Sequence, residues 1–226
     1  MLEDNAPEGW TSGMNAYSVG STPCGCQRKS HDAILVAVTG GPGAGKTAVL
    51  ELARRTFCQH VAILPEAAGI VFEGGFPRHN TEPGRIAAQL AIFQMQRALE
   101  YLAQNEKEVA IALCDRGTLD GIAYWPIAKS RFFAMTGTSL DDEILRYSAV
   151  IHLRSPSAEQ GYTRNAIRIE SAEEARRIDK RIARVWARHP RLLTIPSSDD
   201  FLTKATAALD LVRELLPECC KKHKTR

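Results

Sequence analysis

A glycine-rich run near the start of the chain constrains its fold more than any other feature. The run follows a continuous apolar segment, 33–39, which is typical of a strand buried on both faces. A helical pattern follows the run at 48–55. The run itself consists of Gly40, Gly41, Pro42, Gly43, Ala44, Gly45, Lys46 and Thr47.

Glycines at the two ends of this run allow backbone turns that side chains would block. The freed amides can form a concave anion nest, and the following helix directs the positive end of its dipole to the same point. Lys46 would add a charge near the outer phosphates of a nucleoside triphosphate, and Thr47 would offer a hydroxyl to Mg²⁺. An accidental glycine-rich turn is the alternative, but the position between a strand and a helix favours a phosphate-binding loop.

Apolar, strand-like segments alternate with helical patterns along the chain. We expect strands at 33–39, 61–64, 109–114, 149–153 and 192–195. This alternation predicts one α/β domain over 31–218, with a parallel sheet covered by helices on both faces. A flexible N-terminal tail is expected at 1–30, which is rich in Gly, Ser, Asn and Pro, and a basic C-terminal tail at 219–226.

Charged side chains follow the expected strands, at the edge where parallel α/β sheets bind ligands. Asp115 ends a buried strand and could hold Mg²⁺ as the partner of Thr47. Arg116 could bind a substrate phosphate, although a salt bridge within its loop is the alternative. Glu66 could accept a proton from an attacking hydroxyl or could cap the next helix, and Glu73 is a weaker candidate for the same base.

Positive charge is concentrated in one segment of the chain. Residues 161–191 contain nine basic and four acidic residues, whereas the rest of the chain has 20 basic and 22 acidic residues. Arg164 and Arg168 precede a helix with a capping-box start, and they are candidates for a lid that neutralises the phosphoryl group in transfer. The arginines of the helix itself fit a solvated face better than a binding surface.

Two further groups of residues leave alternatives open. Polar side chains on the helix expected at 86–105 could wall an acceptor pocket or face solvent. Aromatic side chains near the fifth strand could border a nucleotide base or pack in the core. The first group is Gln89, Gln94, Gln96 and Arg97, and the second is Trp186 and His189.

The six cysteines fall into two sets. Cys58 and Cys114 lie in apolar patterns, which is typical of small buried hydrophobic residues. The other four lie in the expected tails. A metal site made from these four is conceivable, but the gap within each pair is shorter than in the usual zinc patterns, so thiols in flexible tails are the favoured interpretation. The tail cysteines are Cys24, Cys26, Cys219 and Cys220.

Composition excludes several other classes of protein. The net charge of +3 does not by itself indicate a nucleic-acid binder, so we expect no specific nucleic-acid partner. No apolar stretch approaches the roughly 18 residues that a membrane-spanning helix requires. The first residues also lack the pattern of a secretory signal, so a cytoplasmic protein is expected.

Three features, namely Glu66 at a strand end, the turn at 115–117 and the Arg-rich segment with Glu170, resemble the nucleoside-kinase branch of P-loop proteins. Within that branch the chain is similar to a group of AAA-domain ATP-binding proteins named for their similarity to the ribosylnicotinamide kinase, over about residues 33–218. This resemblance implies a three-layer fold, a five-stranded parallel sheet of order 2-3-1-4-5, and ATP or GTP binding with Mg²⁺. The strings of residues that resemble this group lie at 64–68, 72–77, 114–121 and 168–175.

The chain departs from the true nucleoside kinases at two positions. Gly117 stands where many of them have Ser, and Ala67 stands where they have Pro, which weakens the inference of a nucleoside acceptor. The guanine-reading pattern Asn-Lys-x-Asp is also missing, since 105–108 is spaced differently. We therefore favour ATP over GTP.

The favoured function is ATP-dependent phosphoryl transfer to an unidentified small-molecule hydroxyl or phosphate. Lys46, Thr47 and Asp115 would hold MgATP, and Glu66 would activate the acceptor. Arg116 would stabilise the transferring group together with the two lid arginines. The alternative is a switch that hydrolyses ATP or GTP slowly and displays its state to a protein or membrane partner. A membrane-surface adaptor that uses the basic segment is a weaker possibility.

Overall fold

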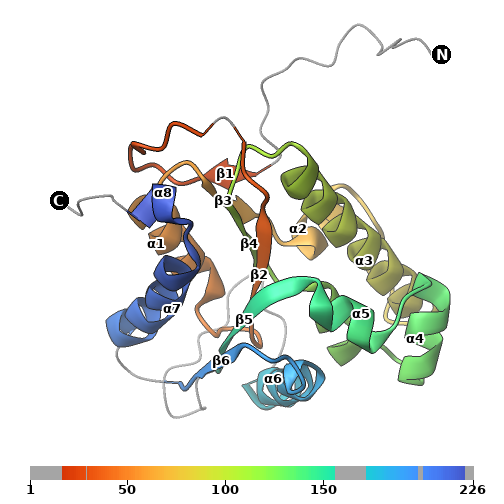
Figure 1. The fold of residues 1–226 in the computed structure, drawn as a ribbon. Helices are drawn as coiled ribbons and strands as arrows, with labels where there is room; N and C mark the ends of the chain where they lie inside the picture. Colours follow the sequence, from red (N-terminus) through yellow and green to blue (C-terminus); the bar gives the residue numbers. More distant parts are fainter. Residues whose placement is uncertain (1–16, 29, 156–171, 198–200, 222–226) are drawn as a thin grey trace, which may run out of the picture.

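One mixed sheet of six strands forms the centre of the molecule (Figure 1). The computed structural model describes residues 17–28, 30–155, 172–197 and 201–221. The strands are β1 (Ser18–Val19), β2 (Ile34–Thr39), β3 (Val61–Leu64), β4 (Ile111–Asp115), β5 (Tyr147–Leu153) and β6 (Leu192–Ile195). Their order is β1-β3-β4-β2-β5-β6. Strand β1 pairs antiparallel with β3, and the other neighbours are parallel.

The expected sheet of five parallel strands is therefore corrected to a mixed sheet of six. The additional strand, β1, lies at the edge and has only two residues, Ser18 and Val19. A two-residue strand has no apolar period, so the sequence pattern gives no sign of it. Residues 17–28 belong with the folded domain rather than with the tail expected at 1–30.

Eight α-helices and one 3₁₀ helix, η1, lie among the described residues. They are α1 (Lys46–Thr56), α2 (Ala67–Glu73), α3 (Glu82–Asn105), η1 (Thr118–Ala123), α4 (Lys129–Thr136), α5 (Leu140–Leu145), α6 (Ala172–Trp186), α7 (Phe201–Leu215) and α8 (Glu218–Lys221). None of the described helices combines the length and apolar character that crossing a membrane requires. Helix α8 overlaps the start of the C-terminal tail expected at 219–226, and its Cys220 is buried.

The sheet separates two hydrophobic cores, as its alternating side chains require. Leu35 and Ala37 of β2 face the core beneath α3 and α6, whereas Val36 and Val38 face the core beneath α1 and α7. Figure 1 shows α1, α7 and α8 on one side of the sheet and α2 to α5 on the other. Full burial of the leucine and valine side chains contributes about 1.5–3 kcal/mol each through the hydrophobic effect.

Parallel register brings the ends of the central strands together. Val38 of β2 pairs with Asp115 of β4, and Thr39 pairs with His152 of β5. Leu64, the last residue of β3, pairs with Cys114. The loops that leave these strands therefore begin side by side at the carboxyl edge of the sheet, where such folds bind their ligands.

Candidate active site

The glycine-rich run leaves β2 in a conformation that its glycines make possible. Gly40, Gly43 and Gly45 all have positive φ angles, of 140°, 77° and 91°. A Cβ atom on Gly40 would lie 2.1 Å from the carbonyl oxygen of Leu153, so this position also requires glycine for space. Helix α1 begins at Lys46, and Gly45 provides no capping side chain. The first amides of α1 are thus arranged as an anion site.

Two side chains hold this loop from outside. Lys204 of α7 donates from Nζ to the carbonyl oxygens of Ala44 and Arg154, at 3.0 and 2.8 Å. Ser155 donates from Oγ to the carbonyl oxygen of Pro42 at 3.1 Å. These hydrogen bonds join residues 50 to 160 positions apart in the sequence, so no local pattern could reveal them.

Asp179 of α6 is a third anchor that the sequence analysis missed. Its Oδ1 accepts a hydrogen bond from the backbone N–H of Gly41 at 3.2 Å and lies 2.9 Å from Nε2 of His152. Its Oδ2 lies 2.9 Å from Nε of Arg154. Burial alone would raise the pKa of Asp179, but these partners, with His152 first, lower it overall. A buried carboxylate thus ties α6 to the loop.

Lys46 is buried beneath the loop and points back along it. Its Nζ donates to the carbonyl oxygens of Gly40 and Gly41, at 3.1 and 3.3 Å. Burial, and then the nearby charge of Arg116, lower the pKa of Lys46 to about 8. Because the ammonium is desolvated and its carbonyl partners carry no full charge, a phosphate would be a stronger partner.

Asp115 lies at the end of β4, beside the root of the loop. Its Oδ1 is buried and has no hydrogen-bond partner among the described residues. Burial raises the pKa of Asp115 to about 6, against the opposing attraction of Lys46. A buried, unpartnered carboxylate oxygen fits a hard cation such as Mg²⁺. Thr47, the other expected ligand, is exposed in the first turn of α1.

Glu66 and Arg116 form an ion pair across the ends of β3 and β4. Nε of Arg116 lies 2.5 Å from Oε1 of Glu66, and its NH1 donates to the carbonyl oxygen of Gly40 at 3.2 Å. Arg116 has a φ of 80°, in the left-handed region that few side chains adopt. Burial alone would raise the pKa of Glu66, but Arg116 reverses this effect and holds the pKa below its usual value.

Asp120 of η1 organises the floor of this site, and the sequence analysis gave it no role of its own. Its Oδ2 accepts a hydrogen bond from Oγ1 of Thr39 at 2.5 Å and lies 3.6 Å from NH1 of Arg116. Its Oδ1 accepts from Nε1 of Trp186 at 2.7 Å. Asp120 therefore connects the end of β2, the Arg116 side chain and helix α6.

Trp186 and His189 pack in the core and do not border an open site. Trp186 is fully buried, and Nε2 of His189 lies 2.8 Å from the carbonyl oxygen of Tyr147. A Cβ atom on Gly117 would lie 2.5 Å from Cζ2 of Trp186. The bulk of Trp186 thus explains why this chain has glycine where many nucleoside kinases have serine.

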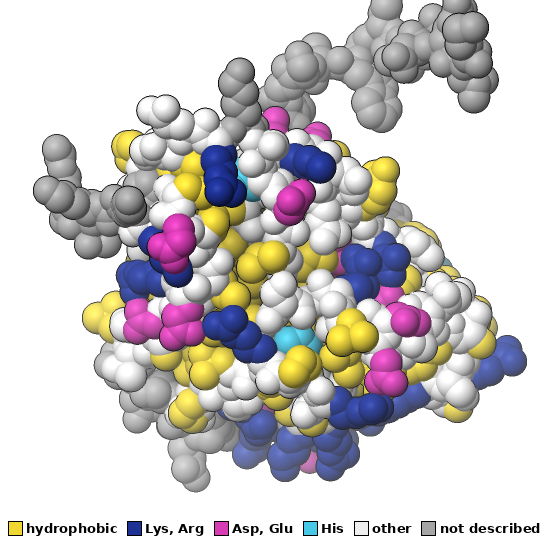
Figure 2. Space-filling view, viewed as in Figure 1, with side chains coloured by type: hydrophobic (Ala, Val, Ile, Leu, Met, Phe, Trp, Pro, Cys, Tyr) yellow, Lys and Arg dark blue, Asp and Glu magenta, His cyan; other side chains and the backbone are white. Residues whose placement is uncertain are grey.

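The basic helix α6 presents its arginines to solvent. Arg177, Arg181 and Arg184 are exposed, whereas Ile178 and Ile182 on the opposite face are buried. Figure 2 shows Lys and Arg side chains gathered at the lower edge of the view, where Figure 1 places α6. The two expected lid arginines, Arg164 and Arg168, lie outside the described residues.

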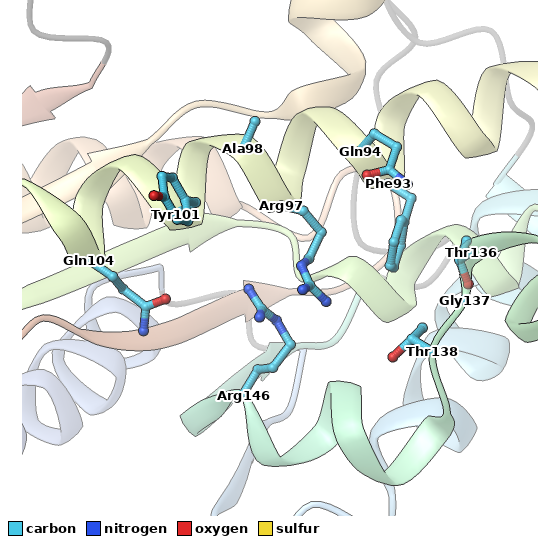
Figure 3. A pocket seen from close by; sticks show the side chains of 10 residues that line it. All are labelled: Phe93, Gln94, Arg97, Ala98, Tyr101, Gln104, Thr136, Gly137, Thr138 and Arg146. Atoms are coloured by element: carbon cyan, nitrogen blue, oxygen red, sulfur yellow. The ribbon is translucent and has the colours of Figure 1, made fainter. Parts of the chain in front are cut away.

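The polar residues of α3 do not converge on one pocket. Gln96 is buried and donates from Nε2 to Oε1 of Glu100 at 2.9 Å. Gln94 and Arg97 line a pocket of about 440 Å³ between α3 and the segment that joins α4 to α5 (Figure 3). Arg146, which also lines this pocket, directly precedes β5. The pocket is therefore at the amino edge of the sheet, opposite the glycine loop.

A second hollow, of about 290 Å³, lies at the carboxyl edge itself. It adjoins the loop, because Ser155 and Asp179 line it and also contact Pro42 and Gly41. The other lining residues are Arg154, Arg176, Lys180, Pro196 and Ser197. The sequence predicts no hollow here, because these residues meet only when the ends of β5 and β6 meet α6.

Known proteins share this architecture. A family model described as AAA domain matches residues 35–203. The crystal structure of NadR protein in complex with NAD and AMP-PNP has a TM-score of 0.60 at 16% identity, covering 86% of this chain and 51% of that chain. The structure of NadR protein in complex with NR has a TM-score of 0.60 at 17% identity, covering 87% and 54%. The chain thus spans about half the length of these NadR chains. No curated protein matches the sequence significantly.

Proposed function

Since the chain belongs to the AAA domain family, we propose that it binds ATP with Mg²⁺ and transfers the terminal phosphoryl group to a small-molecule acceptor. The observation that carries this proposal is the buried Oδ1 of Asp115, which has no partner in the described chain and lies at the root of the glycine loop. An anion nest and an unpartnered carboxylate at one point match the two halves of a magnesium–triphosphate site.

The loop would bind the phosphates through its own groups. The amides at the start of α1 would contact the phosphate oxygens, and Lys46 would exchange two carbonyl partners for an anion. Thr47 and Asp115 would hold Mg²⁺, which neutralises charge on the outer phosphates when it is bound. The anchors Lys204, Ser155 and Asp179 would keep the loop in shape.

The hollow between α6 and the end of β6 would accept the base. It lies beside the loop, and its lining includes Arg154, Arg176 and Pro196. Arginine planes and a proline ring offer flat surfaces to a purine. The NadR structure with AMP-PNP supports ATP as the nucleotide, and the absence of a guanine-reading pattern supports the same choice.

Glu66 would receive the proton of the acceptor hydroxyl. Its side chain is 40% exposed at the carboxyl edge, so an acceptor could reach it. Arg116 would keep Glu66 ionised and positioned through their ion pair. Arg164 and Arg168 would neutralise charge on the transferring phosphoryl group, as the sequence analysis proposed.

A metabolite screen tests this function directly. Thermal shifts would be recorded for a metabolite library in the presence of Mg²⁺ and a non-hydrolysable ATP analogue. Compounds that raise the melting temperature only with the analogue would then be incubated with ATP and analysed for a phosphorylated product. Detection of a product that wild type makes and Lys46→Ala does not make would support the proposal. No shift with any compound, combined with ATP hydrolysis by the wild type, would contradict transfer to a small molecule.

The exposure of Glu66 favours a second candidate, a nucleotide-dependent switch. Neither of the two hollows described above includes Glu66 in its lining, and residues 77–81 nearby along the chain are exposed. An open surface of this kind could display the nucleotide state to a protein or membrane partner. ATP hydrolysis without any phosphorylated product, together with a partner bound only in the triphosphate state, would support this candidate.

A further inference from the structure

Sulfur and imidazole side chains from distant segments meet at the amino edge of the sheet, opposite the glycine loop. The segments are the stretch that follows β1, the turn between α1 and β3, and helix α8 (Figure 1). No disulfide joins any of the chain's six cysteines, all of which the structure describes. The cluster consists of Cys24, Cys26, His31, Cys58, His60, Cys219 and Cys220.

Short distances between possible ligand atoms link four of these side chains, each to the next. Sγ of Cys24 lies 4.0 Å from Sγ of Cys220, which lies 3.4 Å from Nδ1 of His60. The same nitrogen lies 3.9 Å from Sγ of Cys58. All the ligand atoms of this group lie within 4.8 Å of one another. A disulfide would require sulfurs at about 2.05 Å, so these separations correspond to a different arrangement.

The distances match the edges of a tetrahedron around a metal ion. Zinc binds cysteine sulfur at about 2.3 Å and histidine nitrogen at about 2.0–2.1 Å, which places two sulfurs about 3.8 Å apart and a sulfur and nitrogen about 3.5 Å apart. We propose that Cys24, Cys58, His60 and Cys220 bind one zinc ion in a structural site. Three thiolates and one imidazole make a recognised tetrahedral set, and soft thiolates select zinc over hard cations.

The backbone holds the ligands in place before any ion binds. The carbonyl oxygen of His60 accepts hydrogen bonds from the N–H groups of Ala110 and Ile111, at 2.8 and 3.1 Å. Thr22, two residues before Cys24, forms a parallel β-bridge with Cys58 in the turn between α1 and β3. The bridge holds the segment of Cys24 beside this turn. This geometry gives the site the fixed ligand positions that structural zinc sites require.

The surroundings favour a cation as the centre of the cluster. Cys58, Cys220 and His60 are buried, and the sulfur of Cys24 accepts a hydrogen bond from the N–H of Cys26 at 3.4 Å. A divalent cation would compensate the charge of thiolates buried at these positions.

A second set of four ligands shares two members with the first. Cys26, His31, His60 and Cys220 also place their ligand atoms within 4.8 Å. The spacing of the ligands along the sequence does not distinguish the two sets. We assign the ion to the first set because measured contacts of 4.0 Å or less join Cys24 to Cys220, Cys220 to His60 and His60 to Cys58. In the second set, Cys26 interacts with Cys220 and lies 3.6 Å from His31. The experiment below distinguishes the two sets.

Zinc in this position would fasten both ends of the described chain to the domain. Cys24 follows the edge strand β1, Cys220 lies in the last helix, α8, and Cys58 with His60 precedes β3. One ion would therefore crosslink three segments that are up to 196 residues apart. The role is structural, because all four positions are taken by protein ligands and none is left for a substrate.

Metal content of the full chain tests the proposal. The protein would be purified without a histidine tag or chelator, and zinc would be measured by mass spectrometry. We expect about one zinc per chain for the wild type and less than about a tenth of that for Cys220→Ser and Cys24→Ser. Cys114→Ser is the matched control, since Cys114 is buried in β4 away from the cluster, and it should keep its zinc. Cys26→Ser should also keep it.

A measurement on the wild type keeps the test valid if a variant fails to fold. Zinc would be replaced by Co²⁺, and tetrahedral thiolate coordination should then give intense visible absorption that one equivalent of zinc abolishes. Folded wild type that takes up neither metal would overturn the proposal, as would a Cys24–Cys220 disulfide in protein purified under reducing conditions. Loss of zinc in Cys26→Ser with retention in Cys24→Ser would overturn the assigned ligand set.

Discussion

Arg116 and Glu66, fifty positions apart in the chain, are joined by a 2.5 Å contact between Nε and Oε1 at the carboxyl edge of the sheet. The contact holds the pKa of Glu66 below its usual value despite partial burial. In the proposed function, this ionised carboxylate would accept a proton, and its low pKa would make it a weak base unless an acceptor or phosphate displaced Arg116.

This relationship predicts the behaviour of Glu66→Gln, which keeps the shape of the side chain and removes the base. Phosphoryl transfer to the acceptor found by screening should fall by about 10²–10⁴, the usual contribution of a general base. ATP affinity and the slow background hydrolysis of ATP should change much less. Steady-state kinetics with Glu73→Gln, an exposed acid at the end of α2, as the control would test this. Unchanged transfer in Glu66→Gln would leave Glu66 with a purely structural role.

Asp115→Asn should remove the dependence of nucleotide binding on Mg²⁺. The substitution leaves the size of the side chain but replaces the carboxylate whose Oδ1 lacks a partner. Calorimetric titrations of ATP with and without Mg²⁺ should converge in this variant, while some metal-free binding persists. Asp141→Asn, at an exposed position, should retain the wild-type difference. If Mg²⁺ strengthens binding equally in both variants, Asp115 is not its ligand.

Gly117→Ala should destabilise the fold, because its new Cβ would lie 2.5 Å from the Trp186 ring. Such overpacking typically costs about 1–3 kcal/mol in free energy of unfolding. Urea denaturation would measure the cost. Gly69→Ala in α2 is the matched control, since its Cβ meets nothing within 4 Å and helix propensity favours alanine by about 1 kcal/mol. Combining Gly117→Ala with Trp186→Phe should cost less than the sum of the two changes. A fully additive pair would exclude this clash as the reason for glycine.

The sequence was most informative where the chemistry is local. The glycine loop could be placed because its residues are consecutive and lie between a strand and a helix pattern. The acids at strand ends could be located, but the Glu66–Arg116 pair could not, because it depends on the register of β3 beside β4. The roles of Asp120 and Asp179 could not be predicted either, because their hydrogen-bond partners come from other elements.

The ends of the chain were the least predictable part. Strand β1 has two residues and leaves no periodic pattern, so Cys24 seemed to lie in a tail. Cys58 fits an apolar pattern equally well as a packing residue or as a ligand. The cluster with His60 and Cys220 becomes visible only when three distant segments are folded together. Spacing rules detect metal sites whose ligands are close in sequence, and these ligands are not.

Titration calorimetry with Lys46→Ala tests the central claim, that the glycine loop binds a magnesium-bound triphosphate. MgATP would be titrated into the wild type, Lys46→Ala and the exposed control Lys129→Ala. A hydrogen bond to a charged group contributes about 1.5–3 kcal/mol, so we expect Lys46→Ala to weaken binding by about 10- to 100-fold. Its melting temperature should stay near that of the wild type, because burial of the ammonium already lowers its pKa to about 8. Equal MgATP affinity in all three proteins, or no binding to the folded wild type, would contradict the account.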